Sequence, residues 1–298
     1  MAFWAFHHHT SERGGRARLV HWRVPRIIVN ADDFGLTAGV NRAIAELHTA
    51  GVLTSATLMA KAAATNEAIE IARATPTLGV GCHVVLVDGE PVADGLPSLA
   101  PGGRFYSKLG GFLKALLSGR IREAEIEDEA RRQISLLTER GVHLTHVDSH
   151  KHTHMFQRVL RPMLRAAKSC GIRTVRNPFE PAWSVAATPG APFVRKTEVR
   201  LLRLMEKSFR RIVAEEGFAT TDGAMGVLAT GTLDAATVSS LLRAIPPGSS
   251  TYELVTHPGY NDSALANANT RLLASREVER EALAVLLDAQ VELVTFGN

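Results

Sequence analysis

Two adjacent carboxylates end the first strongly apolar run of this chain. Asp32 and Asp33 follow Ile27–Val29 and precede Gly35. Neighbouring carboxylates repel each other, and a cation, a proton or water has to relieve that repulsion. A metal ion held by one acid, with the other acid left free as a base, is one arrangement that does so. The competing interpretation is a helix-capping acid beside a solvated one, but Thr37 is the better candidate for the cap.

A second cluster lies in the segment 145–154, which combines four histidines with one aspartate: His146, Asp148, His150, His152 and His154. Imidazole is the commonest metal ligand in proteins, and its second nitrogen needs an acceptor such as Asp148. His150 lies nearest the end of the expected strand. His152 and His154 are rival ligands, whereas His146 is expected to point elsewhere.

Two single histidines follow other apolar runs. His83 lies in a strand expected over 78–86, where a lone histidine is more often a satisfied core residue, although Gly81 permits the close approach of another group. His257 ends a strand expected over 253–256, where a turn residue explains it equally well. One carboxylate and two imidazoles would make a three-ligand set for a catalytic metal with an open water position. The second carboxylate could then take a proton from that water.

The elements that must position these residues alternate along the chain. Strands are expected at 26–30, 55–59, 78–86, 142–147, 173–175, 225–228, 253–256 and 291–295. Helices are expected between most of them, at 37–50, 65–74, 112–117, 123–139, 157–169, 198–216, 234–244 and 277–287. Such alternation predicts parallel pairing with right-handed crossovers. The carboxyl ends of the strands in a parallel barrel converge on one face, where sites are built.

No linker divides the chain, so one closed or nearly closed barrel fits better than two domains. We expect the barrel domain to cover residues 26–298. Residues 1–25 combine aromatic, histidine-rich and arginine-rich segments. They are interpreted as a disordered extension, or as the result of a start codon placed too far upstream.

Composition excludes several classes of protein. The net charge is only +4, from 34 basic and 30 acidic residues that are spread along the chain, so nucleic acid is not an expected partner. No segment approaches the length of apolar chain that spans a membrane. Neither a dinucleotide-binding glycine motif nor a phosphate-binding loop is present. Cys82 and Cys170 are expected to be buried free thiols, which fits a reducing compartment and a cytoplasmic location.

The ordered motifs resemble those of the YdjC-like carbohydrate deacetylases, which include chitooligosaccharide and hopanoid-biosynthesis deacetylases. The resemblance runs from about Arg26 to the C-terminus and rests on four stretches, at 30–35, 81–83, 146–154 and 256–259. The chitooligosaccharide group often has a second histidine where this chain has Lys151. Lys151 and the stretch 85–91 look more like the hopanoid branch, whereas 257–260 looks like the general group, so the subfamily stays unassigned.

The resemblance implies a distorted or incomplete (β/α) TIM-like barrel that hydrolyses the N-acetyl group of an amino sugar, in an oligosaccharide or a glycolipid. It implies a divalent ion, Mg²⁺ or Zn²⁺, with three matching ligands: Asp33, His83 and His150. Asp32 matches the proposed general base and His257 the proposed general acid. Arg176 would orient Asp32 or the substrate, although a surface arginine in a turn is an equally good interpretation. A bacterial source and a homodimer are further expectations.

Two rival functions stay open. The same residues could serve another metal-dependent hydrolysis, of a phosphoester or of an amide outside sugars. Alternatively, the chain could be a catalytically silent sugar-binding protein, although its intact set of acids and histidines argues against this. Release of phosphate instead of acetate would identify the first rival. Binding of N-acetylglucosamine oligomers without acetate release would identify the second.

Overall fold

The computed structural model describes residues 24–268 and 270–297, which form one domain around one sheet. The strands are β1 (Arg26–Phe34), β2 (Ser55–Leu58), β3 (Gly79–Val84), β4 (Leu144–Ser149), β5 (Thr174–Val175), β6 (Ala219–Thr220), β7 (Gly223–Met225), β8 (Thr251–Thr256) and β9 (Glu292–Leu293). Their pairings in the described part of the chain are all parallel. The predicted extension, residues 1–25, falls almost entirely outside the described residues.

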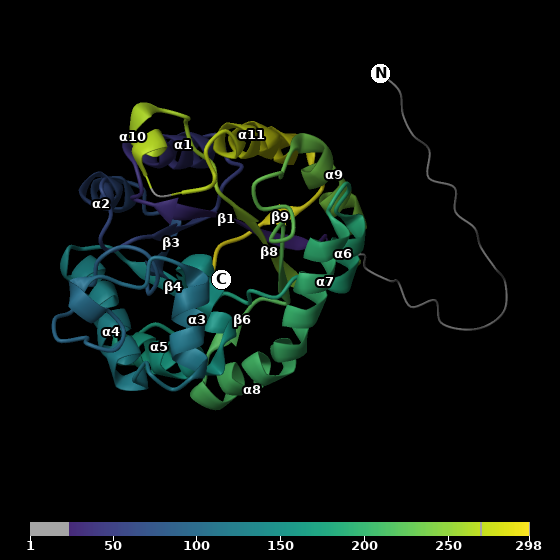
Figure 1. The fold of residues 1–298 in the computed structure, drawn as a ribbon. Helices are drawn as coiled ribbons and strands as arrows, with labels where there is room; N and C mark the ends of the chain where they lie inside the picture. The colour runs from purple at the N-terminus through teal and green to yellow at the C-terminus, as the bar shows by residue number, and fades with distance from the viewer. Residues whose placement is uncertain (1–23, 269, 298) are drawn as a thin grey trace, which may run out of the picture.

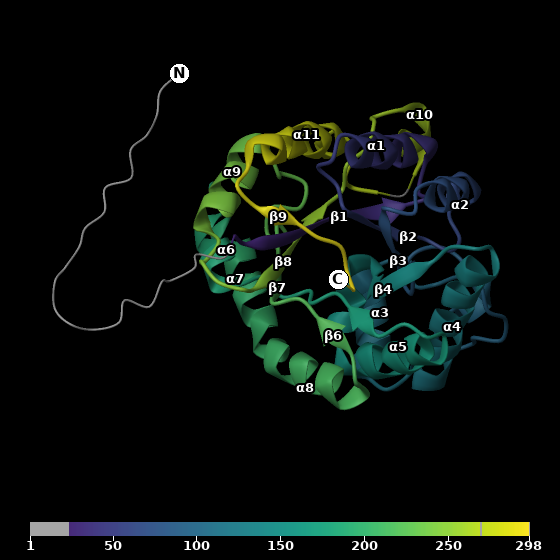
Figure 2. The same cartoon turned by 180° about the vertical axis from the view of Figure 1, so that it is seen from behind.

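The sheet is an incomplete barrel. Its strand order is β6-β5-β4-β3-β2-β1-β8-β7, so β6 and β7 form its two edges although they follow each other in the chain. β9 pairs with the start of β1, at Arg26 and Ile27. β2 pairs with the later part of β1, from Asn30 onward. Figure 1 shows the strands in the centre of a ring of helices, and Figure 2 shows the same arrangement from behind. The prediction of a distorted or incomplete TIM-like barrel is confirmed.

The α-helices are α1 (Ala38–Thr49), α2 (Thr65–Ala74), α3 (Leu109–Leu117), α4 (Glu123–Glu139), α5 (Gln157–Ser169), α6 (Ala182–Ala187), α7 (Phe193–Leu202), α8 (Glu206–Glu216), α9 (Ala235–Ala244), α10 (Ser263–Asn267) and α11 (Ser275–Ala282). The 3-10 turns are η1 (Pro101–Gly103), η2 (His150–Met155), η3 (Arg203–Met205) and η4 (Leu283–Asp288). Several predicted helices, among them α2, α4 and α5, have the expected bounds. The prediction of one long helix over 198–216 is wrong, because α7 begins at Phe193 and the turn η3 separates it from α8.

Local sequence explains where the first elements begin and end. Thr37 is the N-cap of α1, as predicted, because its hydroxyl accepts a hydrogen bond from the backbone N–H of Val40 at 3.3 Å. Gly51 has a φ of +77°, which reverses the chain after that helix. The strands β2 and β3 are buried along their whole length, because helices or other strands cover both faces of the sheet.

Both cysteines are free thiols, as predicted, but only Cys82 is buried, whereas Cys170 is half-buried. Within residues 24–268 and 270–297, none of the helices is both long and apolar enough to cross a membrane.

Candidate active site

A β-bulge at the end of β1 allows two neighbouring acids to lie near the same histidine, His83. Successive side chains of a regular strand point to opposite faces of the sheet. The register of β1 against β2 shifts between Ala31 and Phe34, and Asp33 has a left-handed φ of 64°. A bulge of this kind re-aims a side chain and often lies beside an active site. Both carboxylates therefore lie buried near the carboxyl ends of the strands, with Asp32 2% and Asp33 4% exposed.

Asp32 is held by a buried arginine. Arg176, which directly follows β5, donates to both carboxylate oxygens of Asp32, at 2.9 and 2.6 Å. The side chains of Asn30 and Thr57 each donate to Oδ1 of Asp32 at 3.0 Å. Burial acts to raise the pKa of Asp32, but the charge of Arg176 and its hydrogen bonds hold that pKa far below the ordinary value. Asp32 is therefore ionised at neutral pH.

Arg176 also serves two further buried acids. Its Nε donates to Oε1 of Glu253 on β8 at 2.8 Å, and it forms a short ion pair with Asp148 on β4. Arg176, Asp148 and Glu253 are all fully buried. Burial raises the pKa of Glu253 to about 7, because the nearby charge of Arg176 only partly offsets the loss of solvent. The structure thus places Arg176 inside the site, and the interpretation as a surface turn residue is wrong.

Asp33 has a different cation. Arg276 on α11 is fully buried, and its Nη2 donates to Oδ2 of Asp33 at 2.6 Å. Burial acts to raise the pKa of Asp33, but the charge of Arg276 dominates and keeps that pKa well below its usual value. The repulsion between the two neighbouring acids is therefore relieved by two arginines, which reach them from different elements of the barrel.

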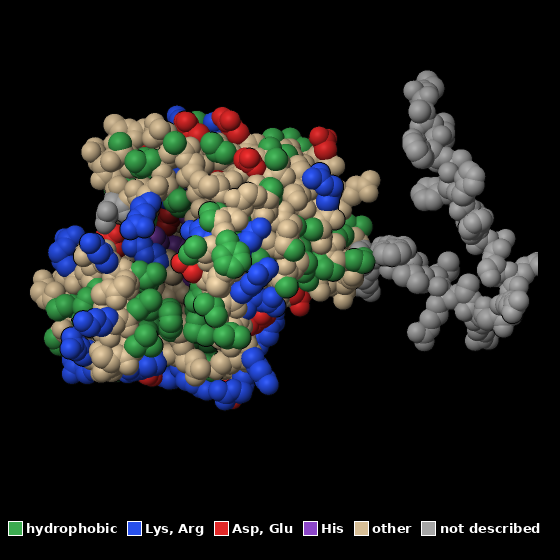
Figure 3. Space-filling model, turned by 45° about the vertical axis from the view of Figure 1, so that its right-hand side comes forward, with side chains coloured by type: hydrophobic (Ala, Val, Ile, Leu, Met, Phe, Trp, Pro, Cys, Tyr) green, Lys and Arg blue, Asp and Glu red, His purple; other side chains and the backbone are tan. Residues whose placement is uncertain are grey.

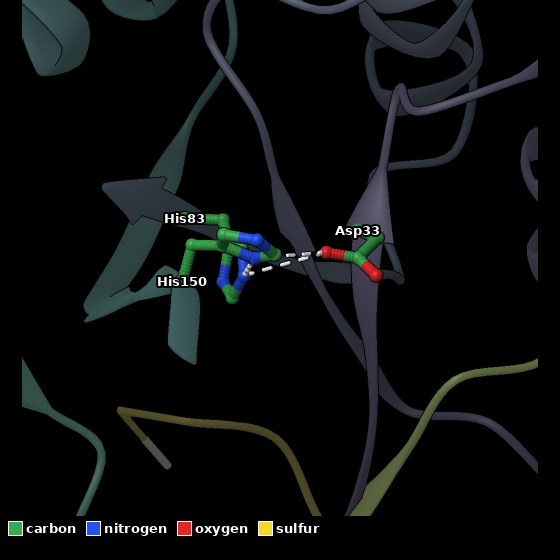
Figure 4. Close-up of side chains that lie close together, drawn as sticks. All are labelled: Asp33, His83 and His150. Carbon is green, nitrogen blue, oxygen red and sulfur yellow. Dashed lines mark hydrogen bonds and ion pairs between the residues drawn. The ribbon is translucent and has the colours of Figure 1, made fainter. Parts of the chain in front are cut away.

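Three side chains converge on one point at the carboxyl ends of the strands (Figure 4). Oδ1 of Asp33 lies 3.6 Å from Nε2 of His83 and 3.3 Å from Nδ1 of His150, and the two histidine nitrogens are 3.3 Å apart. His83 belongs to β3, and His150 follows β4. One carboxylate oxygen and two imidazole nitrogens at this spacing form a potential metal-ion site.

Asp148 fixes the orientation of the His83 ring. Nδ1 of His83 lies 2.8 Å from Oδ1 of Asp148, so Nε2 is the nitrogen that faces Asp33 and His150. Ligating histidines commonly have such a carboxylate partner. Burial acts to lower the pKa of His83, but the charge and the hydrogen bond of Asp148 raise it to about 9. His83, Asp148 and Asp32 also lie close enough together to hold a metal. There, however, the Arg176 guanidinium already supplies the positive charge, and Nδ1 of His83 is engaged by Asp148.

His257, which directly follows β8, lies between Asp32 and Glu279. Its Nε2 is 3.7 Å from Oδ2 of Asp32, and its Nδ1 is 3.6 Å from Oε2 of Glu279 on α11. The backbone N–H of His257 also donates to Glu279 at 2.6 Å. Burial acts to lower the pKa of His257, but the interaction with Glu279 outweighs it and raises that pKa. His257 is therefore held in a state that favours the imidazolium.

The remaining histidines of segment 145–154 lie outside the potential metal site. His146 packs against Phe296 with a ring-centroid distance of 3.8 Å, and its Nδ1 lies 2.9 Å from the hydroxyl of Thr145. Nδ1 of His154 lies 2.7 Å from the hydroxyl of Ser149. Burial lowers the pKa of His152 to about 3, and within the described residues its Nδ1 has no hydrogen-bond partner.

Two residues of this site, Arg276 and Glu279, were not predicted from the sequence. They lie three residues apart on α11, so they are on the same side of that helix. In the sequence they stand among other charged residues, and the pattern is typical of a solvated helix. Only the position of α11 over the site distinguishes them, so the sequence carried no signal that could have found them.

Figure 3 shows a hollow in the surface with histidine side chains in it and basic, acidic and hydrophobic side chains near it. Lys151, directly after His150, has a left-handed φ of 57°, and its Nζ lies 3.6 Å from Oδ2 of Asp88. His150 is the most exposed member of the potential metal site, with 23% of its side chain accessible, whereas Asp32 and Asp33 are buried.

The fold and the site define an open (β/α) barrel with a carboxylate and imidazole centre at the carboxyl ends of its strands. A family model described as YdjC-like protein matches residues 26–292, and the chain belongs to this family. A Brevibacillus brevis protein named carbohydrate deacetylase is 32% identical over 286 residues, which cover 92% of this chain and 99% of the relative. A human protein of the same name is 31% identical and covers 79% of this chain and 75% of the relative.

Solved structures support the fold. An Enterococcus faecalis protein described as a cellobiose-phosphate cleavage protein superposes with a TM-score of 0.73 at 23% identity, over 92% of this chain and 98% of that chain. A lactam utilization protein from Thermus thermophilus has a TM-score of 0.52 at 16% identity, over 91% of this chain and 100% of that chain. At these identities the likeness extends to the fold alone. The relatives come from mammals as well as bacteria, so they do not single out a bacterial source.

Proposed function

We propose that this protein is a carbohydrate deacetylase that uses a divalent metal ion to hydrolyse the N-acetyl group of an amino sugar and release acetate. The observation that carries the proposal is the convergence of Asp33, His83 and His150 on one point, with a second carboxylate and an imidazole beside them. The names of the relatives agree with this chemistry, because proteins that match most of this chain are called carbohydrate deacetylases.

The donor set fits a divalent metal ion. Asp33, His83 and His150 would hold it, and a set of two imidazoles and one carboxylate favours Zn²⁺ over Mg²⁺, which prefers oxygen ligands. When bound, such an ion polarises the acetamide carbonyl and, if it is Zn²⁺, lowers the pKa of a bound water to about 7. Asp148 would keep Nε2 of His83 directed at the ion.

Asp32 is the proposed general base. Its Oδ2 accepts the proton of the water that attacks the acetamide carbon. Arg176 holds this carboxylate ionised and in one orientation, but the same contact makes it a weaker base. Arg176 donates to both carboxylate oxygens of Asp32, so its main contribution to the proposed reaction is to hold that carboxylate in position.

His257 is the proposed general acid. As the C–N bond breaks, its Nε2 donates a proton to the departing amine, which leaves acetate and a free amino sugar. Glu279 favours the protonated imidazole that this step requires. The proposed base and acid are therefore neighbours, with Oδ2 of Asp32 and Nε2 of His257 3.7 Å apart, and their partners Arg176 and Glu279 favour opposite protonation states.

The roles of the two acids predict different results for two isosteric variants. Asp32→Asn should lower kcat by about 100-fold or more, because the proton acceptor is lost, and should leave the metal content unchanged. Asp33→Asn should lose the metal, because it removes the charged ligand. Acetate release from N-acetylglucosamine, its oligosaccharides and N-acetylated glycolipids, with metal analysis of the same samples, measures both effects.

Asp288→Asn, which changes an exposed carboxylate, is the matched control and should behave as wild type. Loss of metal in Asp32→Asn with retention in Asp33→Asn would exchange the two roles. Release of phosphate from phosphorylated sugars without acetate release would replace the proposed reaction by phosphoester hydrolysis. Saturable binding of N-acetylglucosamine oligomers without any product would make the protein a silent binder. A homodimer and a cytoplasmic location remain predictions for light scattering and cell fractionation.

A further inference from the structure

Helix α7 and the turn η3 expose an apolar face. Four large side chains on them are mostly exposed: Phe193 (78%), Val194 (66%), Leu201 (60%) and Leu204 (78%). Val194, Leu201 and Leu204 follow Phe193 by one, eight and eleven residues. At about 3.6 residues per turn, these spacings place all four side chains within one side of the helix. None of the residues of α7 is buried. Contiguous exposed apolar side chains of this size mark interaction sites.

Basic side chains border this apolar face. Residues 193–207 contain five basic and two acidic residues. Arg203 lies 3.6 Å from Glu206. Three other basic residues, Lys196, Arg200 and Lys207, make no ion pair within the described part of the chain. The helix thus combines exposed hydrophobic area with basic side chains that have no ion-pair partner among residues 24–268 and 270–297.

The two kinds of side chain meet in a groove between α6 and α7. Its volume is about 460 Å³, and it is lined by Ala182, Val185, Arg200, Arg203 and Leu204. An apolar floor with guanidinium groups at its border suits a molecule that has an anionic head and an apolar tail. Figure 3 turns the side with α6 and α7 toward the viewer and shows hydrophobic and basic side chains next to each other there.

The charge of this surface distinguishes between the partners that could cover it. A two-fold contact with a second copy would bring the same basic helix against itself, and like charges at an interface are unfavourable. The N-terminal residues 1–23 carry four arginines and one glutamate, so their charge also repels this helix. An anionic lipid surface complements both properties, because its headgroups attract lysine and arginine and its acyl chains accept the apolar side chains.

We propose that the exposed side of α7 and η3 docks the protein reversibly on anionic membranes. The helix would lie in the plane of the lipid headgroups, with Phe193, Val194, Leu201 and Leu204 inserted and the basic residues against the phosphates. Each lysine or arginine near such a surface contributes roughly fivefold to the binding constant, and salt weakens this contribution. This property is independent of the deacetylation chemistry, because none of these residues belongs to the site.

Co-sedimentation of the full chain with vesicles tests the proposal. The wild type should bind phosphatidylcholine vesicles that contain about one third phosphatidylglycerol, should not bind pure phosphatidylcholine, and should dissociate at high salt. The double variants F193S/L204S and R200E/K207E should each bind at least about tenfold more weakly. Their acetate release from a soluble substrate and their circular dichroism should match those of the wild type, which separates lost docking from lost folding.

Two variants elsewhere on the surface serve as matched controls. Leu287→Ser removes another exposed leucine, whose side chain is 64% exposed, and Arg132→Glu reverses another exposed arginine. Both should bind vesicles like the wild type. The proposal is overturned if the wild type ignores anionic vesicles, or if the α7 variants and the controls bind equally. It is also overturned if Phe193→Ser abolishes a dimer in light scattering while vesicle binding is absent, because a second copy would then be the partner.

Discussion

Asp32 and Asp33 are neighbours in the chain, yet each is paired with a different arginine. Arg176 neutralises Asp32, and Arg276 neutralises Asp33. A buried carboxylate needs such a partner, because desolvation alone would drive it to take up a proton. The two arginines come from different parts of the barrel, so each acid can be held in a different orientation. This separation supports the different roles that we propose for them.

Residue identity in the sequence led to most of the site but not to its geometry. The types and order of Asp32, Asp33, His83, His150 and His257 were sufficient to group them, because parallel strands bring their carboxyl ends together. Strand alternation alone would have sent the two acids to opposite faces. The bulge that prevents this depends on the left-handed backbone of Asp33, which no residue type at that position requires.

Glu279 should set the alkaline limit of activity through His257. In the proposed reaction His257 acts as an acid, so the rate should fall as pH rises through its pKa, and Glu279 raises that pKa. Glu279→Gln lowers the pKa of His257 and should move the alkaline limb of the kcat profile to lower pH. The loss of kcat at neutral pH should be smaller than the roughly 100-fold or greater loss expected for His257→Ala.

The kcat profile from about pH 6 to pH 9 measures this effect. Glu281→Gln, on the same helix with a side chain 72% exposed, is the control and should leave the profile unchanged. If Glu279→Gln lowers kcat equally at every pH, Glu279 supports only the fold around His257, and the assignment of His257 as a protonated acid loses its support.

The pairing of β3 with β4 depends on one glycine. Gly81 pairs with His146 across the two strands, and a Cβ atom at position 81 would lie 2.5 Å from the His146 ring. That ring is packed against Phe296, so it has little room to move. The sequence predicted that Gly81 permits the close approach of another group, and the group is this histidine. It could not identify the partner, because the register between the two strands is a tertiary feature.

Gly81→Ala should therefore lower the free energy of unfolding by about 1–3 kcal/mol. His146→Ser removes the ring, so the variant G81A/H146S should lose less than the sum of the two single losses. Urea unfolding of the four proteins measures this coupling. Gly110→Ala, at an exposed position of α3 with free space around the new methyl group, is the control and should be neutral or stabilising. Additive losses would mean that the ring and the glycine do not constrain each other.

At the element scale, the sequence predicted best those helices and strands that have strong local signals. Thr37, Gly51 and the apolar periodicity gave the early elements nearly correct bounds. None of the predicted helices covers the segment 178–192, yet it contains α6. The helix α11 was anticipated, but its role was not, because Arg276 and Glu279 have meaning only where that helix crosses the barrel.

The whole molecule is a barrel with an opening between β6 and β7. The charged residues of its site come from several different strands of the sheet. β1, β3, β4 and β8 and the segments that follow them supply acids and histidines, and α11 closes the site from outside the sheet. The alternation of elements predicted this arrangement, since in a parallel barrel each strand end contributes to one face. The strands nearest the opening, β5, β6 and β7, are very short; the sequence predicted strands at 173–175 and 225–228 but none at the position of β6.

Because the buried acids around His83 raise its pKa, the binding of a metal ion and the stability of the fold should both depend on the protonation of His83. Its pKa is about 9 in the folded chain and about 6.5 when unfolded. A raised folded pKa stabilises the metal-free protein fully below about pH 6.5, and this contribution is lost as pH rises toward about 9. A metal ion needs the deprotonated ring, so its affinity should rise up to about tenfold per pH unit across the same interval.

The stabilisation of the protein by Zn²⁺ should therefore grow between about pH 6.5 and pH 9 and then level off. At a metal concentration of about 100 times Kd it amounts to about 2.7 kcal/mol, which is readable as a rise in Tm. Thermal unfolding with and without Zn²⁺ at a series of pH values measures this. His83→Asn should abolish both the stabilisation and its pH dependence, whereas Asp288→Asn should preserve them. A stabilisation by Zn²⁺ that is the same at every pH, or that persists in His83→Asn, would place the ion elsewhere and separate the histidine cluster from metal binding.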